Sequence, residues 1–229
     1  MKQLVSQAII LSRTDYGEAD RIITVLTPDY GKLALLARGV RKVKSRLAGG
    51  IELFSVSEIT FIKGRGSVST LVSTRLLKHY DRIVTDLERT MLGYDLIKQL
   101  NRATEDETEP EYFGLLQQTF EALDDQAVSQ QIVRTWFAAQ LLRLGGHMPN
   151  LQTDTNGDKL AVTQQYSFDF DHMAFRPEPE HGQFSADHIK LLRLAYGDYR
   201  PQVLAHVHGG TALLAQCAPL AQALRDMHR

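Results

Sequence analysis

The sequence has 229 residues, of which 43% are hydrophobic and 23% are charged, and these proportions are those of a globular protein rather than a disordered one. No apolar run approaches the roughly 18 residues of a membrane-spanning helix, and the N-terminus has no signal-peptide pattern. The single cysteine, Cys217, cannot form an internal disulfide. We therefore expect a cytoplasmic protein without a membrane segment.

The net charge of −1 conceals an uneven distribution of charge along the chain. Residues 1–80 contain 13 Lys and Arg against 6 Asp and Glu, a balance of +7, whereas the remainder contains 13 against 21, a balance of −8. A basic region attached to an acidic one indicates that only the first is suited to a polyanionic partner.

The first 80 residues have the pattern of short strands separated by turns. Apolar alternation or β-branched runs predict strands over 4–11, 21–27, 32–37, 52–62 and 68–77. Turns are expected at Pro28–Gly31 and at Gly64–Gly66. Five strands in so short a segment predict an OB-fold barrel, and an SH3-like barrel with the same number of strands remains an alternative.

After residue 80 the apolar spacing becomes that of helices. One predicted buried face carries, in chain order, Ile83, Leu87, Met91, Tyr94, Ile97 and Leu100. An acidic loop over 105–111 precedes a helix that begins at Pro110, and a third helix, which includes Trp136, ends at Gly145-Gly146. The fold class is therefore α+β in two domains, an OB-fold over 1–80 and a mostly helical domain over 81–229.

Residues 147–184 differ from the helices on either side. This segment mixes turn residues with short apolar pieces, so we expect an irregular insertion containing one small hairpin. Helices resume after Ser185, a suitable N-cap, and breaks are expected at Gly197, Pro201, Gly209-Gly210 and Pro219.

A cluster of cations lies between the third and fourth predicted strands. Arg38, Arg41, Lys42, Lys44 and Arg46 occur within nine residues that contain no acid, and the flanking Gly39 and Gly49-Gly50 suggest a flexible loop. Such a cluster can neutralise several phosphates without sequence preference, although a solvated loop without a ligand is the alternative. The predicted nucleic-acid-binding residues are these five together with Lys32, Lys63 and Arg65.

Ordered sequence blocks around this cluster resemble a known family. They are Tyr16-Gly17-Glu18-Ala19-Asp20-Arg21, Thr27, Gly31-Lys32-Leu33, Ala37-Arg38-Gly39-Val40-Arg41-Lys42, Lys44-Ser45-Arg46-Leu47 and Phe54. Together they resemble the N-terminal signature of RecO proteins, and the helical part resembles the family in its layout.

The resemblance implies a mediator of DNA repair and homologous recombination in the RecF pathway that is not an enzyme. Such a protein binds single- and double-stranded DNA, anneals complementary strands and acts on DNA coated by single-stranded DNA-binding protein. Its implied partners are RecR, the C-terminal tail of single-stranded DNA-binding protein and, indirectly, RecA, and its location is the nucleoid. For the tail we expect a hydrophobic recess edged by Arg134 and Arg143. These two residues are nine positions apart on one predicted helix, and we expect them on similar faces of it.

The chain departs from the family at the insertion, where many RecO proteins carry four zinc-binding cysteines. Here the stretch after Pro149-Asn150-Leu151 reads Gln-Thr-Asp-Thr-Asn-Gly and no cysteine occurs before Cys217, so we expect no cofactor and no structural zinc. Were zinc bound, the first ligands to consider would be Asp154, Asp169, Asp171 and His172.

Other chemistry has weaker support in the sequence. His206 and His208 lack a third metal ligand nearby, Gly64–Ser67 lacks the Lys of a phosphate-binding loop, and Cys217 lies in an apolar segment. No catalytic constellation emerges. The main alternative is an RNA-binding or protein-binding adaptor that uses the same barrel, with a metal-dependent nuclease, suggested by Asp169–His172, a distant third.

Overall fold

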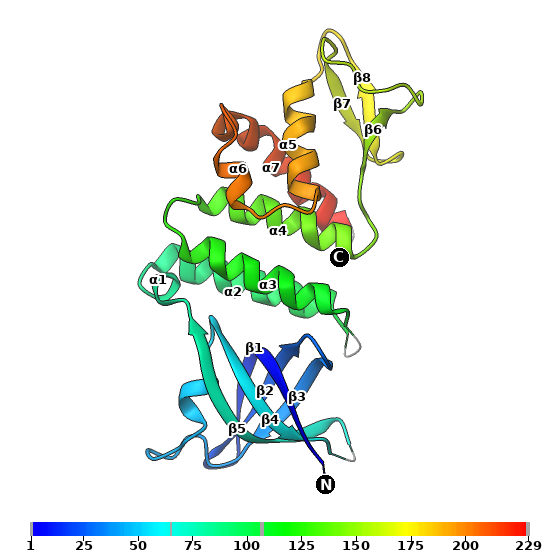
Figure 1. Cartoon of the computed structure of the whole chain (residues 1–229). Coiled ribbons are helices and arrows are strands. Elements are labelled where there is room, and N and C mark those ends of the chain that lie inside the picture. Colours follow the sequence, from blue (N-terminus) through cyan, green and yellow to red (C-terminus); the bar gives the residue numbers. More distant parts are fainter. Residues whose placement is uncertain (1, 65, 106–107, 228–229) are drawn as a thin grey trace. The chain divides into compact units, whose positions relative to one another are not determined.

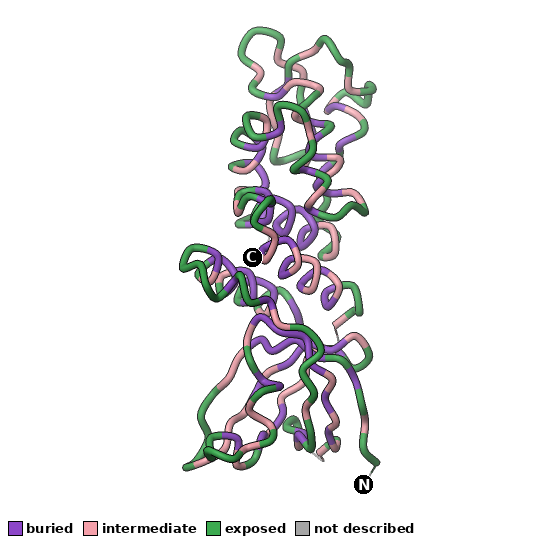
Figure 2. Tube along the Cα trace, turned by 60° about the vertical axis from the view of Figure 1, so that its left-hand side comes forward, coloured by how far each residue is buried: buried purple, intermediate pink, exposed green. Residues whose placement is uncertain are grey.

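The structure is a computed structural model that describes residues 2–64, 66–105 and 108–227. The chain forms two compact units, Met1–Asp124 and Asp125–Arg229. Strands give way to helices at residue 80, as the sequence predicts, but the first unit also includes the three helices that follow the barrel. In each unit, buried residues follow the elements that pack together and exposed residues are concentrated in the connections (Figure 2).

Five strands form a closed barrel in the first unit (Figure 1). They are β1 (Gln3–Tyr16), β2 (Asp20–Thr27), β3 (Gly31–Ala37), β4 (Ser55–Ile62) and β5 (Val68–His79). The order around the barrel is β1-β2-β3-β5-β4, and β1 closes against β4. Only the pairing of β3 with β5 is parallel. The predicted OB-fold is confirmed, and the SH3-like alternative is wrong.

Two strands differ in extent from the prediction. β1 is longer because its first half pairs with β4 and its second half with β2, with a bulge between Ile10 and Ser12 that lets one strand serve both neighbours. β4 begins at Ser55 rather than at Glu52, because Phe54 has a positive φ of 56° and interrupts the extended backbone.

Three helices complete the first unit: α1 (Asp81–Val84), α2 (Leu87–Ala103) and α3 (Pro110–Asp124). Pro110 begins α3 as predicted, whereas part of the acidic loop, residues 106–107, lies outside the described residues. The rings of Tyr94 and Phe120 meet Phe54 edge to face at 5.2 and 5.5 Å, which joins α2 and α3 to the barrel.

The predicted buried face of α2 is partly wrong. Ile97 and Leu100 are buried, but Leu87 and Met91 are 75% and 64% exposed. The stripe that packs inward instead includes Leu92 and Leu96. Each follows its preceding residue, Met91 or Asp95, by about 100° around the helix axis, so the buried face is rotated by one residue from the predicted one. The sequence contains two overlapping apolar stripes, and helical spacing alone does not say which one faces the core.

The second unit is built from helices and a small sheet. The helices are α4 (Gln130–Leu144), α5 (Ala186–Tyr196), α6 (Gln202–Ala205) and α7 (Gly210–Met227). The predicted stop of α4 at Gly145, the N-cap Ser185 and the buried Trp136 are confirmed. The break predicted at Pro219 is wrong: α7 continues through it, because its apolar face packs on α4 and α5 and outweighs the loss of one backbone hydrogen bond.

The segment 147–184 contains a three-stranded sheet with the order β6-β8-β7. Its strands are β6 (Asn150–Asp154), β7 (Tyr166–Asp169) and β8 (Ala174–Pro177). β7 and β8 form the predicted hairpin, and β6 adds a parallel strand that the sequence does not reveal. The fully buried Phe175 contacts the rings of Phe168 and Phe184 at 5.2 and 5.5 Å, so aromatic packing holds the sheet together.

Candidate nucleic-acid interface

The cationic segment Arg38–Arg46, here called the basic loop, follows β3 at the end of the barrel away from α1–α3 (Figure 1). All five of its cations are exposed: Arg38, Arg41, Lys42, Lys44 and Arg46. The structure therefore brings together five of the eight predicted nucleic-acid-binding residues on one solvent-facing segment.

The basic loop and the residues after it are anchored in the barrel core. Val40 is 4% exposed and Ile51 is 1% exposed, and both belong to the same hydrophobic cluster as the inner strand residues. Leu47 and Ala48 pack against that cluster. The glycine-flanked loop therefore contributes to the barrel core, which its run of charges does not reveal, because apolar residues between and after the cations are buried.

The glycines near the loop have specific structural roles. Gly39 has a φ of +63°, a conformation that favours glycine in the turn after β3. Gly50 is buried so closely against β5 that a Cβ atom there would lie 2.3 Å from the Thr74 Oγ1 atom. By contrast, a Cβ atom on Gly49 would meet nothing within 4 Å.

Hydrogen bonds join the basic loop to the β1–β2 hairpin. The backbone N–H of Gly39 donates to the Asp20 carboxylate at 2.7 Å, and that of Arg41 donates to the Ala19 carbonyl at 3.0 Å. On the other side, the Thr74 hydroxyl donates to the Leu47 carbonyl at 3.2 Å. Two separate sequence blocks, one containing Asp20 and the other Gly39, therefore form one structural feature.

The cations of the barrel fall into two groups. Four of the five strand cations pair with acids: Arg13 with Glu52 at 2.8 Å, Arg21 with Asp15 at 2.8 Å, Arg75 with Glu58 at 3.1 Å and Lys78 with Glu121 at 3.5 Å. The fifth, Lys32, donates to backbone carbonyls. In the basic loop, Arg41 lies 3.6 Å from an acid, Asp15. Arg38, Lys42, Lys44 and Arg46 form no ion pair with any other described residue. Their charges are therefore available to an external anion.

Asp15 lies within ion-pair distance of both a strand cation, Arg21, and a cation of the basic loop, Arg41. The hydrogen bond from Arg21, together with the positive charge of Arg41, holds the pKa of Asp15 below its usual value. Asp15 is thus a fixed negative charge that orients both guanidinium groups at the base of the loop.

The other three predicted residues lie apart from the loop. The Lys32 ammonium donates to the carbonyls of Asn101 and Thr104 at 3.1 and 2.6 Å, which terminates α2 rather than presenting a free charge. Lys63 is exposed and lines a hollow of about 590 Å³ together with the turn between β2 and β3. That turn precedes β3, whereas the basic loop follows β3, so the two lie at opposite ends of this strand. Arg65 lies outside the described residues.

The second unit has a small recess between α4 and α7. It has a volume of about 270 Å³ and is lined by Arg134, Thr135, several alanines and Pro219. Arg143 does not line it and instead donates to the Gln140 side chain at 2.9 Å. The expectation that Arg134 and Arg143 share a face is wrong, because nine residues correspond to two and a half helical turns.

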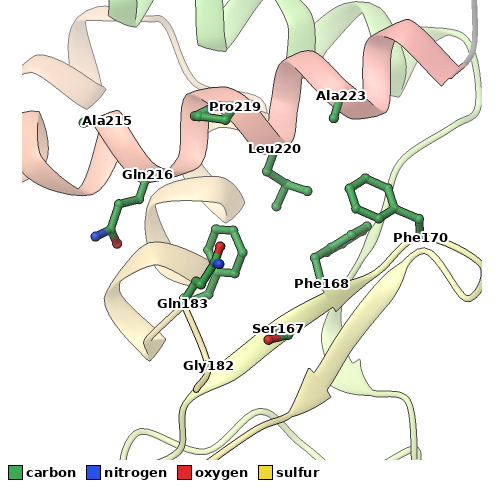
Figure 3. Close-up of a pocket in the computed structure, with 11 residues that line it drawn as sticks. Ser167, Phe168, Phe170, Gly182, Gln183, Ala215, Gln216, Pro219, Leu220 and Ala223 are labelled. Carbon is green, nitrogen blue, oxygen red and sulfur yellow. The ribbon is translucent and has the colours of Figure 1, made fainter. Parts of the chain in front are cut away.

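A larger pocket of about 810 Å³ lies between the small sheet and α7 (Figure 3). Phe168, Phe170 and Leu220 supply its apolar surface, and Gln183 and Gln216 supply polar groups. Its lining contains no charged side chain, so it is unsuited to phosphate.

The remaining candidates for chemistry have structural roles or isolated positions. Burial raises the pKa of the Cys217 thiol to about 12, so it is not a thiolate at neutral pH. In the described part of the chain, no three His, Cys, Asp or Glu side chains are grouped as metal ligands. Among the same residues, no helix has the length and hydropathy needed to cross a bilayer.

Comparison with known proteins gives matches along most of the chain. Residues 1–80 match the family model described as "Recombination protein O N terminal", and residues 85–203 match "Recombination protein O C terminal". A protein of Dehalococcoides mccartyi named DNA repair protein RecO is 32% identical over 163 residues, which cover 70% of this chain and 64% of that protein.

Two further proteins of the same name show a similar relationship. A Roseiflexus protein is 37% identical over 147 residues, covering 64% of this chain and 51% of its own length. One from Halalkalibacterium halodurans is 29% identical over 196 residues, covering 83% and 76%. The chain thus spans between half and two thirds of the length of the first two relatives.

Proposed function

The chain belongs to the RecO family, and we propose that it is a DNA repair and recombination mediator that binds DNA through the basic loop. Family membership supports the role in repair and recombination, and the surface of the barrel supports the mode of binding. The protein binds single- and double-stranded DNA, anneals complementary strands and acts by binding rather than by catalysis.

One observation carries this proposal: the strand cations are held within the protein, four by acids and Lys32 by backbone carbonyls, whereas four of the five cations in the basic loop form no ion pair with a described residue. Unpaired cations on an anchored loop contact phosphates without first breaking an internal ion pair. Such contacts release counterions and carry no information about base identity. A binding mode without sequence preference suits a protein that anneals many different strands.

The proposed partners follow from family membership. They are RecR, single-stranded DNA-binding protein and, indirectly, RecA, and the protein acts at the nucleoid in the cytoplasm. For the acidic, apolar tail of single-stranded DNA-binding protein, the recess between α4 and α7 supplies small apolar residues with Arg134 at its edge. This recess has the chemistry expected for such a tail, with apolar side chains against alanines and a carboxylate near a guanidinium.

Binding to single-stranded DNA at several salt concentrations tests the DNA site. About four phosphate contacts give a log–log slope of roughly −3, since each contributes about −0.7. Replacing Arg41, Lys42, Lys44 and Arg46 with alanine flattens this slope and weakens binding to every sequence alike. Circular dichroism on the same samples confirms that the barrel remains folded, because the anchoring residues Val40 and Ile51 are retained.

A pair of double variants separates local contacts from net charge. Lys42→Ala with Lys44→Ala removes two charges from the basic loop, and Arg176→Ala with Lys190→Ala removes two exposed charges from the second unit. We expect only the loop double variant to reduce the slope of log affinity against log salt concentration. Equal slopes for both pairs, or an unchanged slope in the folded quadruple variant, would place the DNA site elsewhere. A strong preference for RNA would favour an RNA-binding adaptor instead.

Isothermal titration with the tail peptide tests the recess. We expect measurable binding that Arg134→Ala weakens and that Arg143→Ala leaves unchanged, since Arg143 does not line the recess. The absence of heat and of competition with the intact partner would reject this site.

A further inference from the structure

Tyr16, at the end of β1, is an exposed aromatic residue without a partner. It is 55% exposed, and its side chain makes no hydrogen bond or ring contact with another described residue. Tyr30, another exposed aromatic on the barrel, is different because its ring packs edge to face on Phe61 at 5.4 Å. The exposed ring of Tyr16 is therefore not explained by packing within the barrel.

The position of Tyr16 places its ring beside the basic loop. Tyr16 pairs with Asp20 across the β1–β2 hairpin, and directly opposed residues project from the same face of a sheet. The Asp20 carboxylate accepts the backbone N–H of Gly39 at 2.7 Å, so that face adjoins the residue that follows Arg38. The N–H of Arg41 reaches the Ala19 carbonyl of the same hairpin.

The hairpin that carries Tyr16 is held in place on its other face. Asp15 and Arg21 are directly opposed there and are joined at 2.8 Å, and Arg41 lies 3.6 Å from the same carboxylate. A tyrosine on such a support has only two side-chain torsions to fix on binding. Large aromatic contacts are therefore made at a low cost in conformational entropy.

We propose that Tyr16 is a stacking platform for an unpaired base of single-stranded nucleic acid whose phosphates contact the basic loop. This inference rests on the proposed function and adds a contact with bases to the contacts with phosphates. Every base presents an aromatic face, so stacking preserves the lack of sequence preference. The bases of a duplex already stack on one another, so this contact favours single strands.

Strands with and without bases test the proposal on the full chain. The probes are an oligothymidylate and an abasic strand with the same number of phosphates. Tyr16→Ala is expected to weaken binding to oligothymidylate about tenfold, within the range for loss of one base–aromatic stack. It leaves the affinity for the abasic strand and the salt slope unchanged, because the ring carries no charge.

Two further variants identify the group responsible. Tyr16→Phe keeps the ring and is expected to bind oligothymidylate as the unchanged protein does. If it instead weakens binding as Tyr16→Ala does, the hydroxyl group makes the contact and the stacking proposal is overturned. Tyr199→Ala removes a tyrosine of the second unit that is 51% exposed and is expected to have no effect.

A measurement on the unaltered protein avoids any question about the folding of variants. Irradiation of a complex with a strand containing 5-iodouracil is expected to cross-link Tyr16, as identified by mass spectrometry. Cross-links to the basic loop without any to Tyr16 would overturn the stacking proposal while supporting the DNA site. If no strand binds with a salt-dependent affinity, it is the proposed function itself that fails.

Discussion

The basic loop and the insertion at 147–184 are both excursions from regular structure, and both prove to be built on buried apolar side chains. Val40 and Ile51 anchor the loop region, and Phe175 occupies the same role in the small sheet. The difference lies in their polar groups. In the loop, four cations have no acidic partner among the described residues, whereas in the insertion Asp154 and Asp169 each accept two backbone N–H groups in turns.

This difference distinguishes a segment suited to binding from one that is self-contained. Polar groups that satisfy one another stabilise a local structure and leave little for a ligand. Charges that project from an anchored backbone contribute little to folding and remain available to a partner. Changes that disturb one segment and not the other test the comparison.

The largest effect is expected from removing the central ring of the insertion. Phe175→Ala deletes a fully buried phenyl group that contacts two other rings, and its cost to the stability of the second unit is about 3–5 kcal/mol. Trp136, the single tryptophan, is buried in that unit, so its fluorescence during chemical denaturation measures the loss.

The matched control is Phe170→Ala, because Phe170 is 38% exposed at the rim of the pocket in Figure 3. We expect it to cost less than about 1 kcal/mol. Neither variant should alter the salt dependence of DNA binding. Equal destabilisation by both substitutions would contradict the role assigned to Phe175.

The next effect concerns the support of the basic loop. Gly50→Ala forces a methyl group against Thr74 and is expected to cost about 1–3 kcal/mol, the range for overpacking a well-packed site. Gly49→Ala, one residue earlier, has open space and should change stability by less than about 0.5 kcal/mol. Thermal unfolding followed by circular dichroism compares the two, and a tolerated Gly50→Ala would show that the loop is loosely held.

Sequence predicts the barrel well because its signals are local. The β-branched run of β2 and the turn at Pro28–Gly31 specify strands whose partners are adjacent in the chain. The cations of the basic loop are likewise evident from their spacing. Their anchoring is not, because Val40 is an unremarkable residue between two arginines until the barrel closes around it.

Contacts between distant residues account for the features that sequence reasoning misses. Lys32 belongs to the sequence block Gly31-Lys32-Leu33 and is predicted from the sequence to bind nucleic acid, yet it terminates α2 through carbonyls 69 and 72 residues later in the chain. The choice of buried stripe on α2 and the continuation of α7 through Pro219 both depend on which helices pack together. Local spacing does not contain that information.

A smaller effect is expected from pH, through His188 in α5. Burial lowers the pKa of His188, although a hydrogen bond with Gln216 and the charge of Asp187 partly oppose this. Below the usual value of about 6.5, the unfolded chain therefore binds more protons than the folded one. The contribution of neutral His188 to folding stability is complete above that pH. It is lost as the pH falls through the lowered pKa that His188 has in the folded state.

The variant His188→Gln separates titration from capping. The ring Nδ1 atom of His188 accepts the backbone N–H of Ser185 at 3.0 Å, and a glutamine three residues after a serine can accept the same N–H in a capping box. When the pH is lowered from 7.5 to 5.5, we expect the denaturant concentration at the unfolding midpoint to fall less for the variant than for the unaltered protein. An identical decline in both proteins would assign the acid sensitivity to other groups.

The smallest expected effect is that of removing metal. The potential ligands in the insertion are already engaged: Asp154 accepts the N–H groups of Asn156 and Asp158, and Asp169 pairs with His172 at 3.2 Å. Binding zinc through these groups would require both turns to open, and aromatic packing around Phe175 already holds the strands together. We therefore expect that a strong chelator leaves the unfolding of the second unit unchanged and that elemental analysis finds no stoichiometric zinc. One tightly held zinc per chain, lost together with stability on chelation, would show that non-cysteine ligands hold this sheet and would undo the contrast between a self-contained insertion and a ligand-binding loop.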